Sequence, residues 1–325
     1  MMLVAPLKRL VWYRLLRRLR KARDKRVPPR PPSVFSCSGP EANELIRRLL
    51  ASPDPCMIAR FGNNEMRTVQ NYLSVRADRP LAQRVRRYLR GEGGPWWWDD
   101  RTAREMKRGA GFYPASPGNL ERFARMTLED CTEIDLLGSW LPGETELDGL
   151  LRAARVPLGS LEPYFHENQW SEQLRGQRVL VIHPFDQTIR SQYARREALF
   201  RDPRVLPAFE LKTFQSVQSI AGDCTRFSDW FAALEWMKQG IAAIEFDVAI
   251  IGAGAYGMPL AAFCKRELRR KVVHLGGATQ VLFGIKGRRY DERPEYVNLY
   301  NDAWVRPLAG ETPAAAMRVE GGCYW

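Results

Sequence analysis

The sequence has few of the residues that mark metal sites, disulfide frameworks and export signals. It contains only 3 histidines and 6 cysteines among 325 residues. The cysteines are dispersed, with no C-x-x-C pair and no metal-ligand spacing to the histidines, so we expect reduced and mostly buried thiols. Arg14 interrupts the apolar run that starts at Leu10, which leaves it too short for a secretory signal or a membrane-spanning helix.

Acidic residues are scarce only near the N-terminus. The formal net charge of +13 is of the size found in nucleic-acid-binding proteins. However, residues 1–32 hold 11 Lys or Arg against one acidic residue, Asp24, whereas the other 293 residues hold 39 basic and 36 acidic side chains. Because the charge of this larger part is nearly balanced, we do not expect nucleic acid as a partner.

The basic N-terminal segment has the pattern of an amphipathic helix. Arginines alternate with apolar residues at helical spacing, namely Leu3, Leu7, Leu10, Val11, Leu15 and Leu19. We expect residues 1–26 to lie on an anionic membrane surface, which would place a cytoplasmic protein on the inner face of the cell membrane. A solvated tail and an organelle transit peptide are the alternatives. A proline-rich linker at 28–32 then precedes one catalytic domain, residues 33–325.

Apolar, β-branched runs alternate with helical patterns through this domain. We expect strands at 56–61, 133–140, 178–185, 206–214, 247–251 and 271–275, and helices at 40–50, 66–73, 188–200 and 228–240. Together they predict a Rossmann-like α/β fold with a mostly parallel sheet and helices on both faces. Residues 80–118 are expected to be rich in loops, and the aromatic tail is expected to dock on the domain.

Three adjacent tryptophans, Trp96 to Trp98, precede Asp99 and Asp100 in the predicted loop region. Aromatic rings beside carboxylates can stack on a sugar and bind its hydroxyl groups. The alternative is that the tryptophans form the core of a small packed sub-domain.

The glycine turn after the strand at 247–251 carries the strongest indication of a ligand site. Gly252, Gly254 and Gly257 have the spacing G-x-G-x-x-G between a buried strand and a helix, which suits a nucleotide phosphate. A dinucleotide enzyme would carry an acidic residue about 20 positions on, but none follows the strand at 271–275. We therefore favour a nucleotide diphosphate over NAD; tight strand-to-helix packing is the third interpretation.

Polar side chains follow two other predicted strands. Arg60, Asn63 and Glu65 follow the first strand, and His183 and Asp186 follow the strand at 178–185. Open parallel sheets bind ligands at the carboxyl ends of their strands, so these residues are candidates for one site. The structural alternatives are that an asparagine caps the next helix and that the histidine is an internal hydrogen-bonding group.

The assembled motifs resemble those of the GT-D glycosyltransferases. The resemblance rests on Arg60-Phe61-Gly62-Asn63-Asn64-Glu65, His183-Pro184-Phe185, Gly252-Ala253-Gly254-Ala255-Tyr256-Gly257 and His274-Leu275-Gly276-Gly277, and extends from about residue 35 to the end of the chain. It is closest to GT-D-like bacterial proteins encoded with surface-polysaccharide genes. It implies a nucleotide-sugar-binding sheet and an acid-x-acid motif that helps to hold a divalent metal, Mn or Mg. Here Asn63 replaces the first acid, which weakens the metal site and leaves Glu65 as its carboxylate.

The resemblance implies transfer of a sugar from a nucleotide-diphosphate donor to a hydroxyl of a cell-surface glycan or lipid-linked acceptor. The catalytic candidates are Glu65, His183 and Asp186. The candidate donor-binding residues are Arg60, Gly62, Asn63, Gly252, Gly254, Tyr256, Gly257, Gly276, Gly277 and Gln280. The alternatives are an NAD-type oxidoreductase acting on sugar nucleotides and a non-catalytic membrane-associated scaffold of polysaccharide assembly.

Overall fold

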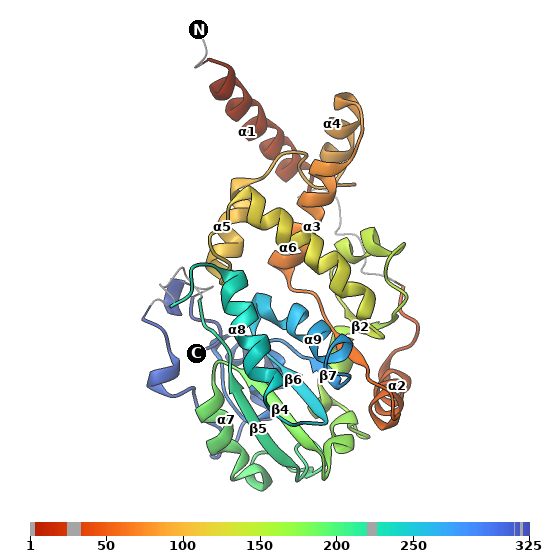
Figure 1. Ribbon diagram of the computed structural model, residues 1–325, viewed down its shortest axis with the longest axis vertical. Coiled ribbons are helices and arrows are strands. Elements are labelled where there is room, and N and C mark those ends of the chain that lie inside the picture. The colour runs from red at the N-terminus through yellow and green to blue at the C-terminus, as the bar shows by residue number, and fades with distance from the viewer. Residues whose placement is uncertain (1–3, 25–33, 220–225, 315, 319–320) are drawn as a thin grey trace.

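Seven parallel strands form one sheet in the computed structural model (Figure 1), which describes residues 4–219 without 25–33, and 226–325 without 315 and 319–320. The sheet order is β3-β2-β1-β7-β6-β4-β5. The strands are β1 (Met57–Ala59), β2 (Leu136–Ser139), β3 (Ala154–Pro157), β4 (Arg178–His183), β5 (Glu210–Gln215), β6 (Val248–Ile251) and β7 (Lys271–His274). The prediction of a Rossmann-like α/β fold is confirmed, and the sheet is parallel throughout.

Both faces of the sheet are buried, which explains why its strands are continuous apolar runs. Leu180 and Ile182 of β4 join one hydrophobic cluster, and Val179 and Val181 join the other. Successive side chains of a strand point to opposite faces, so each cluster lies on its own side of the sheet. β3 was not predicted, because its four residues are mostly half-exposed and end in Pro157.

Helices cover each face. Residues of α3 (Asn63–Arg76), α5 (Asp100–Gly109), α6 (Pro117–Asp130), α8 (Trp230–Ala242) and α9 (Gly257–Arg266) pack in the first cluster. Residues of α2 (Gly39–Ala51), α7 (Asp186–Tyr193), α10 (Ala278–Leu282) and α12 (Pro294–Val297) pack in the second, and α11 (Arg288–Asp291) precedes α12. The prediction of helices on both faces is therefore also confirmed.

Residues 80–118 contain loops, as predicted, but also helices that were not predicted. This region holds α4 (Leu81–Leu89), α5 and the start of α6. The side chain of Asp99 caps α5 by accepting from the Arg101 N–H, and Ser116 caps α6 by accepting from the Asn119 N–H. The many arginines of α4 and α5 obscured the short helical patterns.

The N-terminal segment is helical, as predicted, and forms α1 (Val4–Asp24) at one end of the molecule, beyond α5 and α6 in Figure 1. Tyr13 stacks on Trp97 with ring centroids 4.0 Å apart, and Leu16 is buried. Arg17 forms an ion pair with Asp99. The helix therefore packs against the domain. The side chains before Trp12 and the linker at 28–32 lie outside the described residues.

These contacts favour the packed-core interpretation of the tryptophans over sugar stacking. Trp96 and Trp97 pack edge-to-face with centroids 4.8 Å apart, and both contact Tyr88 of α4. Trp98 packs against the first hydrophobic cluster. None of the described helices is both long and apolar enough to cross a membrane.

Burial raises the pKa of Cys56, Cys131 and Cys264, as expected for reduced internal thiols, whereas Cys224 lies outside the described residues.

Candidate functional site

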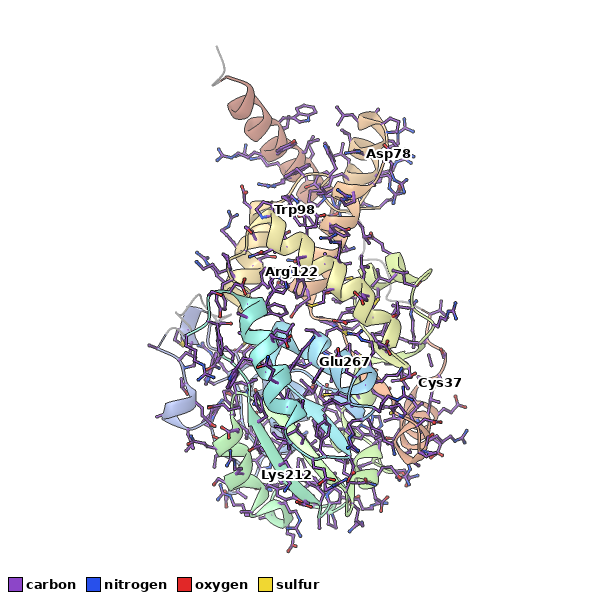
Figure 2. All side chains as sticks on the ribbon, viewed as in Figure 1. Cys37, Asp78, Trp98, Arg122, Lys212 and Glu267 are labelled. Atoms are coloured by element: carbon purple, nitrogen blue, oxygen red, sulfur yellow. The ribbon has the colours of Figure 1, made fainter. Side chains whose placement is uncertain are left out.

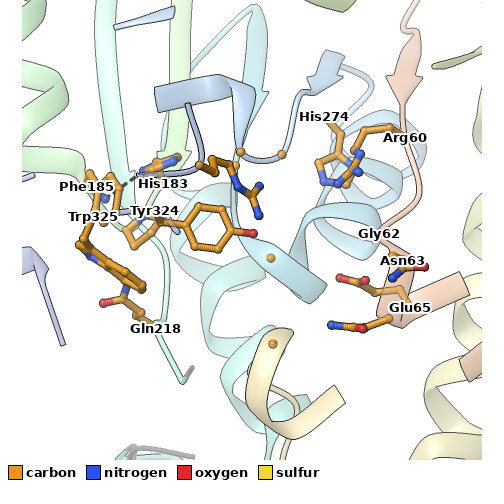
Figure 3. A pocket seen from close by; sticks show the side chains of 18 of the residues that line it. Arg60, Gly62, Asn63, Glu65, His183, Phe185, Gln218, His274, Tyr324 and Trp325 are labelled. Carbon is orange, nitrogen blue, oxygen red and sulfur yellow. Dashed lines mark hydrogen bonds between the residues drawn. The ribbon is translucent and has the colours of Figure 1, made fainter. Parts of the chain in front are cut away.

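A cavity of about 260 Å³ lies at the carboxyl ends of four adjacent strands, β1, β7, β6 and β4 (Figure 3). Each of these strands is followed by a short polar or glycine-containing segment that lines it. From the centre of the sheet, the chain proceeds from β1 outward to β2 and β3 on one side, and from β4 outward to β5 on the other. Ligands of open α/β sheets bind where the connections diverge in this way.

A second cavity of about 670 Å³ adjoins the first. Arg60, Trp140, Gly277 and Arg289 line both cavities. Further residues of the second are basic, acidic and aromatic, among them Glu162, Arg288, Tyr290, Arg293 and Tyr296. The crevice therefore has two compartments with a shared wall.

Arg60 follows β1 and stands in this shared wall. Its guanidinium lies 5.0 Å from the centroid of the Trp140 ring, whose Nε1 donates to the carbonyl of Phe61 at 3.0 Å. Arg60 Nε is buried without a hydrogen-bond partner. Burial lowers the pKa of Arg60, and the charge of Glu65 opposes this effect. Glu65 is thus the nearby negative charge for this half-buried cation, whose buried Nε still has unused hydrogen-bonding capacity.

Glu65 lies in the first turn of α3. The helix begins at Asn63 with Gly62 as its N-cap, so neither Asn63 nor Asn64 is the cap. The carboxylate of Glu65 folds back over Gly62, where an added Cβ would overlap it. An acidic side chain at this position interacts favourably with the helix dipole. Glu65 is the one carboxylate among the described residues that line the smaller cavity (Figure 3).

The donor set fits a divalent metal poorly. No group of three or more His, Cys, Asp or Glu side chains that could hold a metal occurs among the described residues. Glu65 offers carboxylate oxygens, whereas Asn63 offers at best a neutral amide oxygen. Hard cations prefer several oxygen ligands, often carboxylates. A cation here would therefore depend on ligand phosphates and water for most of its coordination.

His183 ends β4 and is buried and neutral. Its Nδ1 accepts a hydrogen bond from the N–H of Phe185 at 3.0 Å. Burial lowers the pKa of His183 to about 3. With Nδ1 as an acceptor, a neutral ring carries its proton on Nε2. The side chain therefore offers an N–H donor to the cavity, which suits a phosphate oxygen and does not suit a general base.

His274 ends β7 and also lines the cavity. Its pKa falls to about 3 because of burial and, secondarily, because of the nearby positive charge of Arg60. Its Nδ1 is buried without a hydrogen-bond partner. The sequence had indicated no role for His274, although it occupies the end of its strand as His183 does.

The three glycines of the G-x-G-x-x-G turn have different structural roles. The N–H of Gly252 donates to the carbonyl of Ile182 at 2.9 Å, so the sheet already uses it. A Cβ at Gly252 would lie 2.7 Å from the carbonyl oxygen of Gly276, and one at Gly257 would overlap His274. Gly254 has a φ of 53° and lines the cavity. Tight packing thus explains the first and third glycines, although Gly252 also lines the cavity together with Gly254.

The structure brings most of the predicted site residues together. Those that line the cavity are Arg60, Gly62, Asn63, Glu65, His183, Gly252, Gly254, Gly276 and Gly277. Asp186, Tyr256, Gly257 and Gln280 are not in its lining. Asp186 is buried and forms an ion pair with Arg190. Tyr256 stacks on Trp230 with centroids 4.7 Å apart.

The C-terminal segment supplies a wall of the cavity, as Figure 3 shows for Tyr324 and Trp325. Trp325 Nε1 donates to the carbonyl of Glu311 at 3.1 Å. The Gln280 amide donates to the carbonyl of Tyr324 at 3.2 Å, so Gln280 holds the tail in place. The aromatic composition of the tail predicted that it docks on the domain. The sequence did not indicate that the tail, Trp140 or Arg289 would line the cavity.

The described lining combines two arginines, two neutral histidines, glycine backbone and aromatic walls with one carboxylate side chain. Such a lining favours an anionic ligand. Comparison of the chain with family models, curated proteins and solved structures finds no significant match. The assignment of function therefore depends on the chemistry of these residues.

Proposed function

We propose that this protein is a nucleotide-sugar-dependent glycosyltransferase with a GT-D-like fold. It would transfer a sugar from a nucleotide-diphosphate donor to a hydroxyl of a glycan or lipid-linked acceptor. The observation that carries this proposal is Arg60, a largely desolvated cation with an unpartnered buried Nε, in a cavity at the carboxyl edge of a parallel sheet. A diphosphate would supply anionic oxygens for this cation and for the N–H of His183.

The donor diphosphate would lie between Arg60, the Nε2–H of His183 and the backbone around Gly254. Cleavage of the sugar–phosphate bond leaves additional negative charge on the departing diphosphate. Preorganised donors lower the barrier by stabilising charge where it develops. Arg60 is held over Gly276, where an added Cβ would lie 3.1 Å from its guanidinium, so little reorganisation is needed.

The acceptor hydroxyl must lose a proton during transfer. His183 is an N–H donor, and Asp186 is paired with Arg190 outside the cavity lining. Glu65 is therefore the candidate to contact the acceptor hydroxyl and take its proton. The body of the acceptor would occupy the larger cavity beyond Arg60 and Trp140, and its reacting hydroxyl would have to reach Glu65 in the smaller one.

Ligand-induced thermal shifts test the proposal. The protein would be heated with UDP, GDP, CMP and NAD, each with and without manganese, because a ligand that binds the folded state raises the midpoint temperature. We expect a shift with one nucleoside diphosphate. Its sugar conjugate should then release that diphosphate when incubated with a glycan acceptor. A shift with NAD alone would favour the oxidoreductase, and diphosphate binding without sugar transfer to any acceptor would favour the scaffold.

A further inference from the structure

We propose that α1 and α4 together form a docking platform for an anionic lipid surface. The platform is defined by four exposed apolar residues, Trp12, Leu15, Leu19 and Leu81, and by exposed basic residues beside them, Arg14, Arg18, Lys21, Arg79, Arg86 and Arg90. α1 packs beside α4. Figure 2 shows their side chains projecting at the end of the molecule near the labelled Asp78.

The inner face of α1 is already occupied by the protein itself. Arg20 donates to the carbonyls of Tyr88 and Gly93 at 2.6 and 3.0 Å, and its guanidinium lies 5.2 Å from the Tyr88 ring centroid. These contacts add to those of Tyr13, Leu16 and Arg17 with the Trp97 region. The orientation of the helix is therefore fixed, and the same residues always point outward.

The outer face is amphipathic in the manner of an interfacial helix. Trp12, Leu15 and Leu19 stand at positions i, i+3 and i+7, so they form one stripe along the helix. They are 49%, 46% and 49% exposed. Arg14, Arg18 and Lys21, at positions i, i+4 and i+7, are also exposed and form a second stripe on the adjoining face of the helix. Apolar side chains next to basic ones insert between lipid headgroups while the charges contact anionic phosphates.

This composition favours a lipid surface over nucleic acid. A nucleic acid would satisfy the basic residues through its phosphates, but it would leave the three apolar side chains of α1 in water. Burial of Trp12, Leu15 and Leu19 among headgroups removes this apolar area from water as well. The occupant that satisfies both kinds of side chain is an anionic membrane.

One helix connects the platform to the cavity. The first turn of α3 carries Asn63 and Glu65, whereas Asn71 further along donates to the carbonyls of Pro95 and Trp97, at 2.9 and 2.8 Å. If the proposed function holds, the docked protein would keep its cavity at a constant distance from the lipid surface, which suits an acceptor carried on a lipid.

Vesicle co-sedimentation of the full chain tests the platform. The vesicles would contain phosphatidylcholine with or without phosphatidylglycerol. We expect binding only with the anionic lipid, and loss of binding in the triple variant Trp12→Ala, Leu15→Ala, Leu19→Ala. A second triple variant, Arg14→Gln, Arg18→Gln, Lys21→Gln, should bind roughly a hundredfold more weakly, since each basic residue near the surface contributes about fivefold.

Matched controls change equally exposed residues elsewhere. The triple variant Leu150→Ala, Phe165→Ala, Leu308→Ala and the triple variant Arg48→Gln, Arg175→Gln, Arg201→Gln should bind vesicles like the parent protein. Equal loss in platform and control variants would overturn the proposal, as would binding to a DNA oligomer that exceeds vesicle binding and survives the apolar triple variant.

The platform and the proposed enzyme activity can fail independently. Both platform variants should retain the thermal shift with the soluble nucleoside diphosphate, which also shows that they fold. Vesicle binding without any nucleotide shift would leave the platform standing and remove support for the transferase. A thermal shift with the nucleotide but no vesicle binding would support the transferase and overturn the platform.

Discussion

The backbone N–H of Phe185 donates a hydrogen bond to Nδ1 of His183 at 3.0 Å. This single contact decides what the histidine can do, because it directs the imidazole proton to Nε2. His183 then resembles a fixed amide donor more than an acid–base group. The glycosyltransferase proposal therefore assigns it to the donor phosphate.

This assignment predicts different effects for two substitutions of His183. His183→Gln keeps an N–H donor near the position of Nε2, so we expect binding of the nucleoside diphosphate within about threefold of the parent. His183→Ala removes the donor and should weaken binding by about tenfold, because one hydrogen bond to a charged group usually contributes at least this much to affinity. Titration calorimetry measures both. Equal losses in the two variants would contradict the donor role, and His166→Ala, outside the cavity lining, is the control.

The same histidines predict the pH dependence of stability. Folding lowers the pKa of His183 and His274 to about 3, below the ordinary value of 6.5. The unfolded chain therefore binds more protons at these two positions between these values, and the contribution of the histidines to the free energy of unfolding should be highest above about pH 6.5 and fall as the pH decreases toward 3. Each histidine contributes a slope of up to about 1.4 kcal/mol per pH unit. Urea unfolding at several pH values checks this.

The double variant His183→Gln, His274→Gln should lose most of that slope below about pH 6. Nucleotide binding should stay nearly constant from about pH 6 to 8, since neither ring changes charge there. An unchanged stability slope in the double variant would show that other groups cause the acid sensitivity.

Arg60 predicts opposite effects on stability and on binding. Because a desolvated cation with an unpartnered Nε is unfavourable, Arg60→Met should leave the free energy of unfolding within about 1 kcal/mol of the parent or raise it. The same change should weaken diphosphate binding by at least about tenfold. Arg48→Met, at an exposed position, is the control for both measurements. A loss of several kcal/mol in stability with unchanged binding would show a structural role instead.

The glycine turn predicts a separation between packing and binding. In Gly252→Ala the new Cβ would lie 2.6 Å from His183 Cδ2 and 2.7 Å from the carbonyl oxygen of Gly276, so we expect a loss of about 2 kcal/mol in unfolding free energy. In Gly254→Ala the surroundings are open and only the positive φ is strained, which costs about 1 kcal/mol.

Gly176→Ala is the matched control for Gly254→Ala, because Gly176 also has a positive φ and open space around it. Both variants should lose similar stability in urea unfolding, but only Gly254→Ala should weaken nucleotide binding. If Gly254→Ala bound the nucleotide as tightly as the control does, the turn would serve close packing and would not contribute to nucleotide binding.

The sequence predicted the core of the sheet well and the peripheral elements poorly. Strands such as Val248–Ile251 are apolar throughout because both faces of the sheet are covered, and such runs are conspicuous. β3 lacked that signal because it is short and half-exposed. Helix α3 begins at Asn63, earlier than predicted, because Gly62 is the cap and the polar residues belong to its first turn.

The candidate site was predictable where a residue directly follows a strand. Arg60, His183 and Gly252 belong to this group, because parallel strands bring their carboxyl ends to one edge. Trp140 and Trp325 reach the cavity through tertiary contacts, which local patterns do not encode. The G-x-G-x-x-G spacing predicted a ligand-facing turn of three glycines, whereas two of them serve close packing.

The strand order also has a consequence during synthesis on the ribosome. β1 pairs with β7, whose residues emerge about 215 residues later, a delay on the order of ten seconds or more at ordinary translation rates. Until then β1 presents an unpaired edge in the nascent chain, and unpaired edges invite aggregation. The cavity needs Trp325 as well, so it can form only after residue 325 has been synthesised.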